Sequence, residues 1–172
     1  KTLEDLGAEV EEFTPAWGPK GPEIGRFFWS ILWGRRAGVL EEFADRMSPD
    51  LVACMREGAN YSANDYLNWR ERKYAYVAEI AETLSRYDFL VSPAVSVAAF
   101  PVERVQPAHW PEDPWNWLAW AEFSYPFDMS GDPACSVPCG FTPAGLPVGL
   151  QIVARRFDDL GVLQAAHALE QA

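Results

Sequence analysis

What the 172-residue sequence lacks excludes several classes of protein. No apolar run approaches the roughly 20 residues that a membrane-spanning helix needs, and no charged and apolar leader with a small-residue cleavage site opens the chain. We therefore expect a cytoplasmic protein that does not enter a membrane. Basic residues are also few, with 14 Lys and Arg against 25 Asp and Glu and a net charge of −11 at pH 7. Such a charge disfavours the polyanionic backbone of nucleic acid as a partner.

Cysteine is scarce as well. The three cysteines, Cys54, Cys135 and Cys139, are odd in number and lie in a chain too large to depend on disulfides. We expect free, buried thiols with structural roles, in a reducing compartment. No second Cys/His pair accompanies Cys135 and Cys139, so the sequence predicts neither a metal site nor a cofactor.

The remaining composition, 49% hydrophobic and 23% charged, is typical of a globular protein. The chain opens with Lys1 rather than methionine, and Lys1–Leu6 has the pattern of the last turns of a helix that Gly7 ends. The alternating segment Ala8–Phe13 then predicts a strand. Because six residues are too few to nucleate a helix, we expect that earlier residues are missing or were removed. The alternative is a frayed N-terminal turn in a complete protein.

Helical spacing dominates the next part of the chain. Apolar residues over 24–47 predict one long or bent helix, with Gly34 and Gly38 as weak points or close-packing contacts. Ser48 followed by a proline predicts the start of a short helix, which we expect to end near Gly58. Ser62 predicts the cap of a third helix. The apolar stripe of that helix comprises Tyr66, Trp69, Val77, Ile80 and Leu84.

Strands and turns dominate the last part. Asp88–Pro93 is a short apolar run that suits a buried strand of a parallel or mixed sheet better than an edge strand. Ala134–Pro138 and Val148–Val153 predict two more strands, joined by a turn over 142–145. Asp158 or Asp159 is expected to cap a final helix. Its apolar stripe comprises Leu160, Leu163, Ala166, His167 and Leu169.

About four separated strands with four helices and no internal repeat predict an α/β fold whose sheet is incomplete within this chain. Aromatic rings are concentrated between residues 107 and 127, where they either fill a core or line an apolar cavity. The rings in this segment are Trp110, Trp115, Trp117, Trp120, Phe123, Tyr125 and Phe127.

The tail carries a resemblance to a known family. The stretch Tyr125–Gly140 is similar to the pattern P-F-N-x-x-G-x-P-A-x-S-x-P-x-G, and Gly145–Gln151 is similar to G-L-P-x-G-x-Q. An acidic helix cap and the pattern L-x-x-A-x-x-x-E at Leu163–Glu170 follow in the same order. With similar matches at Leu6–Val10 and Tyr87–Pro93, the chain resembles the C-terminal part of the amidase signature family.

One position departs from the family pattern. Asp128 stands where many members carry Asn, and an ionised carboxylate accepts hydrogen bonds but cannot donate them. The departure affects the hydrogen bonds expected around residue 128 rather than the resemblance itself.

The resemblance implies a mixed β-sheet covered by helices on both faces, with residues 1–172 as the C-terminal portion of a single domain. It also implies carboxamide hydrolysis by a serine nucleophile, a second serine and a lysine, which belong to the N-terminal portion of the family. This sequence contains no Ser-Ser pair, and its lysines are Lys1, Lys20 and Lys73. We assign no catalytic residue to it. His109 and His167 lack a context that would activate a nucleophile.

The resemblance also gives an expectation for the substrate. In similar amidotransferase subunits that use glutamine, an acidic residue before the Pro-x-Asn motif holds the substrate amino group, and the matching position here is Ala121. The arginine partner that those subunits carry for the substrate carboxylate, at a matching position on the short helix near Cys54, is also not seen. We therefore expect an apolar or aromatic amide as substrate. Trp117 and Ala121, one turn apart if the segment is helical, are the predicted substrate-binding positions.

Three interpretations of the protein as a whole remain open. The first is the C-terminal part of an amidase, whose partners are the N-terminal part of the same enzyme and a small amide, in a possible homo-oligomer. The second is a truncated, non-catalytic relative that acts as an interaction module through an unpaired sheet edge. The third is a component of a tRNA-linked amidotransferase, which Ala121 disfavours.

Overall fold

The computed structural model describes residues 1–110 and 116–172, without the side chains of residues 116–118. The helices along the chain are α1 (Thr2–Asp5), α2 (Gly21–Gly34), α3 (Leu40–Phe43), α4 (Pro49–Ala59), α5 (Ala63–Leu84), α6 (Tyr125–Ser130) and α7 (Asp159–Glu170). Short 3-10 helices are η1 (Gly18–Lys20), η2 (Ala37–Val39), η3 (Ala44–Arg46) and η4 (Asn116–Ala121). The strands are β1 (Phe89–Pro93), β2 (Ala134–Phe141) and β3 (Pro147–Ala154).

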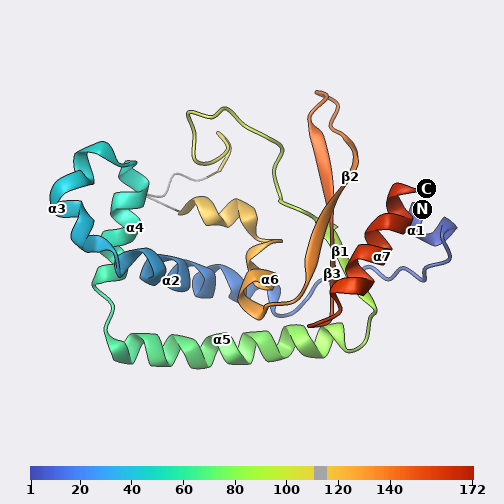
Figure 1. Ribbon diagram of the computed structural model, residues 1–172, viewed down its shortest axis with the longest axis horizontal. Coiled ribbons are helices and arrows are strands. Elements are labelled where there is room, and N and C mark those ends of the chain that lie inside the picture. The colour runs from blue at the N-terminus through green and yellow to red at the C-terminus, as the bar shows by residue number, and fades with distance from the viewer. Residues whose placement is uncertain (111–115) are drawn as a thin grey trace.

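The three strands form one antiparallel sheet in the order β1-β3-β2. In Figure 1 this sheet stands between α7 on one side and α6 with the end of α5 on the other, while α2, α3 and α4 extend away from it. The predicted strands at 88–93, 134–138 and 148–153 are confirmed. The expectation that the first of them is an inner strand is wrong for the residues described, because β1 lies at an edge and pairs antiparallel with β3.

Helices cover both faces of the sheet, as an α/β fold requires, because successive residues of β3 point to opposite sides. Val153 packs into a cluster with Ile80 and Leu84 of α5 and Phe127 of α6. Ile152 packs instead with Ala166 of α7 and Val137 of β2. The predicted incomplete α/β fold is confirmed.

Local signals mark the starts of three helices, α4, α5 and α7. Ser62 accepts the N–H of Asp65 at 3.1 Å, and the Asp65 carboxylate accepts the N–H of Ser62 at 2.8 Å, which completes a reciprocal cap. Asp158 accepts the N–H of Gly161 at 3.1 Å and so caps α7. The short helix that Ser48 and Pro49 predict is also confirmed.

The one long or bent helix predicted over 24–47 is interrupted, and Gly34, one of its two predicted weak points or close-packing contacts, is confirmed as the place of the break. Helix α2 ends at Gly34, and two 3-10 helices and the short α3 follow. The break coincides with a tertiary contact, since a Cβ built on Gly34 would lie 2.2 Å from the backbone carbon of Gly58. The absence of a side chain at Gly34 therefore allows α2 to pack closely against α4 at the residue where α2 ends.

The strand predicted over 8–13 does not form within the described residues. These positions carry no ladder hydrogen bonds and their side chains are exposed, including Val10 at 48% and Phe13 at 41%. A strand is stable only beside a partner strand, and this segment has none among the residues described. The described strands therefore number three rather than about four.

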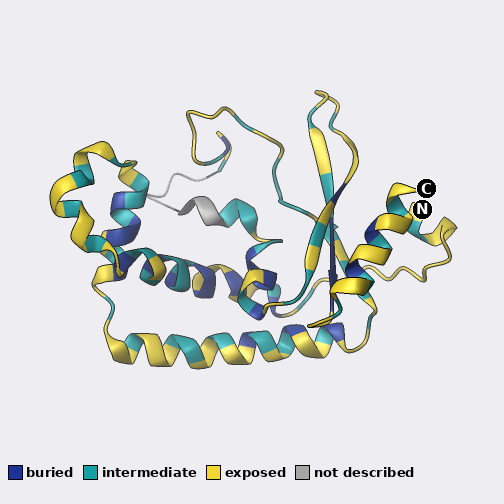
Figure 2. Ribbon diagram, in the orientation of Figure 1, coloured by how far each residue is buried: buried dark blue, intermediate teal, exposed yellow. Residues whose placement is uncertain are grey.

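The apolar stripe predicted for the last helix is only partly correct. Helix α7 buries Val162 and Ala166, whereas Leu160 and Leu163 are 66% and 63% exposed. The stripe of α5 is confirmed at Ile80 and Leu84, which are buried, and at Trp69, which packs against the same core cluster. Tyr66 is 40% exposed. Figure 2 shows the first half of α5 with exposed residues along much of its length.

The three thiols are unpaired, as predicted, but they are not all buried. Cys54 is fully buried, Cys135 is half-buried and Cys139 is exposed. Cys139 belongs to the outer end of the β2–β3 hairpin, where residues 138–141 of β2 are all exposed. Among the described residues, no helix has the length and apolar content needed to cross a bilayer.

Candidate functional site

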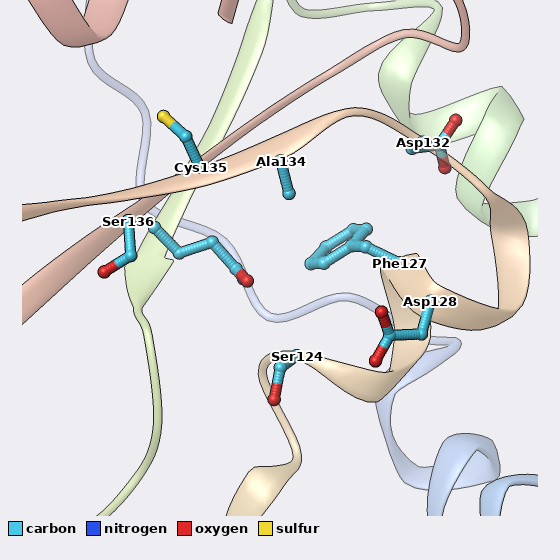
Figure 3. Close-up of a pocket in the computed structure, with 8 residues that line it drawn as sticks. Ser124, Phe127, Asp128, Asp132, Ala134, Cys135 and Ser136 are labelled. Atoms are coloured by element: carbon cyan, nitrogen blue, oxygen red, sulfur yellow. The ribbon is translucent and has the colours of Figure 1, made fainter.

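A cavity of about 300 Å³ opens between α6 and the strands β2 and β3 (Figure 3). Figure 3 shows Asp128 beside Phe127 and Ser124, while the Cys135 side chain turns away from them. The lining combines two carboxylates, two hydroxyls and one amide with apolar groups. The lining residues are Ser124, Phe127, Asp128, Asp132, Ala134, Cys135, Ser136 and Gln151.

The turn between α6 and β2 brings these groups together. Pro126 lies in the first turn of α6, where its missing N–H costs no helical hydrogen bond. Gly131 ends the helix at φ 73°, a left-handed conformation that favours glycine, and its N–H donates to the Phe127 carbonyl at 2.8 Å. The Ser130 hydroxyl donates to the Asp132 carboxylate, which fixes this acid at the rim. This contact gives Asp132 a part in the turn between α6 and β2.

A polar row crosses the sheet on the face of the cavity. Strand register places Gln151 of β3 between Ser92 of β1 and Ser136 of β2. The Gln151 amide nitrogen donates to the Ser92 hydroxyl at 3.2 Å and to the Phe123 carbonyl at 2.6 Å. Gln151 is 7% exposed, so these bonds tie the segment before α6 to the centre of the sheet.

The same segment is held a second time through Trp120. The Ser96 backbone N–H and hydroxyl both donate to the Trp120 carbonyl, at 3.3 and 2.8 Å. The indole N–H of Trp120 donates to the Val105 carbonyl at 3.1 Å, and its ring meets Phe100 edge to face at 5.7 Å. The loop after β1 and helix η4 are therefore joined in one aromatic wall of Phe100 and Trp120, a few residues before Ser124 of the cavity lining.

The two predicted substrate-binding positions both fall on η4. Trp117 belongs to this helix, but its side chain lies outside the described residues. Ala121 is half-buried, and its carbonyl accepts the N–H of Ser124 at 3.0 Å. A 3-10 helix has three residues per turn, so positions four apart do not stack as they would in an α-helix. The assignment of both positions to the substrate stays a prediction.

The cavity contains no activated nucleophile among the described residues. Burial, followed by the nearby Glu170, raises the pKa of the Cys135 thiol, which disfavours the reactive thiolate. Lys20 is paired with Glu79 at 2.6 Å, and Lys73 lies over the Phe28 ring at 5.1 Å. Within the described part of the chain, no group of three or more His, Cys, Asp and Glu is arranged to hold a metal ion.

The histidines also lie apart from the cavity lining. The His109 ring meets Trp110 edge to face at 5.6 Å, and His167 is exposed on α7. The cavity can thus bind polar groups through its carboxylates and hydroxyls, but the described residues offer no base and nucleophile pair. Sequence patterns identified the segment 125–151 but not the convergence of Ser124, Ser136 and Gln151, which depends on strand register.

Comparison with known proteins adds three findings. The chain matches the Amidase family model over residues 1–163. It is 33% identical to an acylamidase of Rhodococcus erythropolis over 179 aligned positions, which cover 98% of this chain and 36% of the relative. It is 37% identical over 114 positions to a glutamyl-tRNA(Gln) amidotransferase component of Myxococcus xanthus, and this match covers 66% of this chain and 22% of that one.

Structural comparison agrees on the fold. A crystal structure of an amidase superimposes with a TM-score of 0.83 at 24% identity, and the match covers 98% of this chain and 39% of that one. The chain therefore spans less than half the length of the proteins that it matches.

Proposed function

Because the chain belongs to the amidase signature family, we propose that it is the C-terminal part of an enzyme that hydrolyses carboxamides to a carboxylate and ammonia or an amine. The single observation that carries the proposal is the match of residues 1–163 to the family model, which includes every element around the cavity. The nucleophile and base are then supplied by residues outside this chain. This part contributes sheet strands and one wall of the substrate pocket.

We infer that the substrate is an apolar or aromatic amide. The aromatic wall formed by Trp120 and Phe100 is anchored at both its carbonyl and its indole, so it presents rigid apolar surface at small entropic cost. Ala121 follows directly and offers no charge to a substrate amino group. The match to an acylamidase of Rhodococcus erythropolis over 98% of this chain supports an acyl amide as the substrate.

The test is an assay of the intact enzyme with aryl acetamides and with glutamine. We expect aryl acetamides to be turned over with the higher kcat/KM. Efficient use of glutamine without any preference for aryl amides would contradict the inference about the substrate, and inactivity towards all amides would contradict the proposed function itself.

We also propose that the intact protein is located in the cytoplasm.

A pair of variants at one position sharpens the test. Ala121→Asp supplies the acidic group that the glutamine-using subunits carry, and we expect it to lower kcat/KM for aryl acetamides at least about tenfold. Ala121→Ser adds a group of similar size without charge and serves as the control. Equal effects of the two variants on kcat/KM would show that a charge at residue 121 does not influence the use of the substrate.

A second function is favoured by the 37% identity to the amidotransferase component of Myxococcus xanthus. Under that alternative the intact protein would work in a complex and release ammonia from glutamine. The same substrate comparison separates the two. A truncated relative that only binds a partner is the third possibility, and ammonia release by the intact protein would exclude it.

The 172-residue chain expressed alone provides a further test. We expect no amide hydrolysis, because the proposed nucleophile and base lie outside this chain. We also expect poor solubility or self-association, because much of the apolar surface of α7 and β1 is exposed. A homogeneous monomer that releases ammonia from a simple amide would contradict this expectation.

A further inference from the structure

The side chain of Gln151 has a fixed orientation at the cavity between α6 and the sheet. Its nitrogen donates to the Phe123 carbonyl at 2.6 Å and to the Ser92 hydroxyl at 3.2 Å. A backbone carbonyl can only accept, so the atom that faces Phe123 must be the amide nitrogen and not the oxygen. Both amide hydrogens are then used, and the oxygen is the atom that Gln151 leaves to the cavity that it lines.

The Gln151 side-chain oxygen accepts no hydrogen bond from the residues that the structure describes. Gln151 is only 7% exposed, so a partner for this oxygen has to come from the space of the cavity. A buried acceptor that stays unpaired is unfavourable. An occupant that donates a hydrogen bond to Gln151 is therefore favoured there.

Most other polar side chains of the lining also act as acceptors. The Ser124 hydroxyl donates to the Ala121 carbonyl at 3.1 Å, so only its lone pairs are left for an occupant. The Asp132 carboxylate already accepts the Ser130 hydroxyl. The exposed Asp128 carboxylate forms no hydrogen bond or ion pair with any described residue. An ionised carboxylate can accept several hydrogen bonds but cannot donate one.

Donors and positive charges are scarce in this lining. Among the described residues, no Lys, Arg or His lines the cavity, and the donors left over are the Ser136 hydroxyl and the weak Cys135 thiol. Figure 3 shows the Cys135 side chain turned away from the carboxylates. An anion would meet two carboxylates without a compensating cation, whereas a ligand that brings its own hydrogens and a positive charge is complementary to the cavity.

The acceptors come from separate elements and surround one space. In Figure 3 the side chains of Ser124 and Asp128 lie on one side of this space and Ser136 lies across it, with the Phe127 ring at its border. An aromatic ring is a favourable neighbour for a cation and for an alkyl group. The cavity of about 300 Å³ has room for an amino group with a short organic chain, since one water occupies roughly 30 Å³.

We propose that this cavity is a binding site for a small ligand with a protonated amino group, which donates to the Gln151 oxygen and pairs with Asp128. In the proposed amidase this ligand is the ammonia or amine that hydrolysis releases, so the identity of the ligand rests on the proposed function. Ammonia and alkylamines are protonated at pH 7, as a lysine side chain is. The cavity then recognises the nitrogen side of the amide.

Calorimetric titration of the intact enzyme at pH 7 and constant ionic strength tests the site. The probes are ammonium chloride and methylammonium chloride, with potassium chloride as the control, because potassium matches ammonium in charge and size but donates no hydrogen bond. We expect ammonium and methylammonium to bind at least about tenfold more tightly than potassium. Equal affinities for ammonium and potassium, or no binding of either amine, would overturn the proposal.

Two variants that each remove one negative charge locate the binding. Asp128→Asn keeps the size of the side chain, and we expect it to raise the Kd for methylammonium at least about tenfold. Glu103→Gln is the control, because Glu103 is exposed and lies outside the cavity lining, and it should change this Kd less than about twofold. Equal effects would show that the net charge of −11, and not the cavity, attracts the cation. Should Asp128→Asn fail to fold, the comparison of ammonium with potassium decides the question.

The titration measures binding without turnover, so the two proposals can fail separately. An intact protein that hydrolyses amides but does not prefer ammonium to potassium contradicts the site alone. An intact protein that binds methylammonium through Asp128 but hydrolyses no amide contradicts the proposed function alone.

Discussion

The paired helices α2 and α4 and the sheet with α7 differ in how completely this chain covers them. Between α2 and α4 the backbones touch at Gly34 and Gly58, Ser30 and Cys54 are fully buried, and Arg26 pairs with Glu57 at 2.9 Å. Around the sheet, Val91, Leu160 and Leu163 stay exposed. Figure 2 shows the contrast, with exposed residues along the outer side of α7. Helices α2 and α4 bury their facing sides against each other, whereas the sheet and α7 leave apolar surface exposed that another partner could cover.

The largest expected effect concerns the contact between the two helices. A Cβ at Gly58 would lie 1.8 Å from the Ser30 carbonyl oxygen, so Gly58→Ala must push the helices apart. We expect a loss of about 3 kcal/mol in the free energy of unfolding, at the upper end for overpacking. Urea unfolding measures it. The control is Gly38→Ala, where a Cβ meets nothing within 4 Å. Equal losses would show that the helix contact is not tight.

Thiol labelling compares the two regions directly. Burial, with the nearby Glu57 adding to it, raises the pKa of Cys54 from 9.0 to about 12, whereas Cys139 is exposed on the hairpin. At pH 8 we expect Cys139 to react with an aromatic disulfide reagent at least about 100-fold faster than Cys54. Cys139→Ala should remove the fast phase and Cys54→Ala should leave it. A fast phase that survives Cys139→Ala would contradict the assignment.

The Cys54 thiol also makes the free energy of unfolding depend on pH. The unfolded chain releases the Cys54 proton near pH 9.0, while the folded chain retains it to about 12. The contribution of this group to stability is therefore complete below pH 9 and decreases as the pH rises towards 12. Unfolding of the Cys54→Ala variant should show a weaker decline over this range. An unchanged decline would mean that other groups cause it.

A smaller effect is expected at the junction of the helix pair with α5. Ser62→Ala removes the side chain that accepts the Asp65 N–H, and we expect a loss of about 1 kcal/mol in the free energy of unfolding. The Ser62 hydroxyl and N–H also lower the pKa of Asp65, so the contribution of the cap is lost as the pH falls through the folded pKa. Ser62→Asn keeps a capping oxygen and should retain most of the stability. If both variants lose the same amount, capping is not the cause.

The smallest effect concerns the outer side of α7. Leu163 is 63% exposed, so Leu163→Ser in the 172-residue chain should change the free energy of unfolding by less than about 0.5 kcal/mol. We expect the soluble yield of this chain to rise. Val162→Ser on the neighbouring, buried position is the control and should be clearly destabilising. A large loss from Leu163→Ser would show that this side of α7 is already covered.

Sequence predicted those elements whose signals are local. The caps at Ser62 and Asp158 and the apolar runs of β1 and β3 all lie within a few residues of the structure that they specify. The close contact of Gly34 with Gly58 joins two residues that are 24 positions apart in the chain, and no local pattern contains that contact. The segment 8–13 has the alternation of a strand but needs a partner that the described residues do not include.

The candidate site was predictable to a similar extent. The motif that ends in Gln151 pointed to the correct hairpin, and the row that Gln151 forms with Ser92 and Ser136 follows from strand register. Register is set by the pairing of strands that are distant in sequence, so the row is not visible in any single segment. The turn expected between residues 142 and 145, which depends on local sequence alone, is confirmed. The Gly145 N–H donates to the Thr142 carbonyl at 2.8 Å.

The order β1-β3-β2 also has a consequence for the synthesis of this protein. The central strand β3 is made last of the three, 54 residues after β1 ends, from Pro93 to Pro147. At about 5–20 residues per second, β1 is exposed on the nascent chain for about 3–10 s before its partner in this sheet has been translated. During that interval β1 has no partner strand within the described sheet. The three strands of this sheet can therefore come together only after β3, which is made last and pairs with both of the others, has been translated.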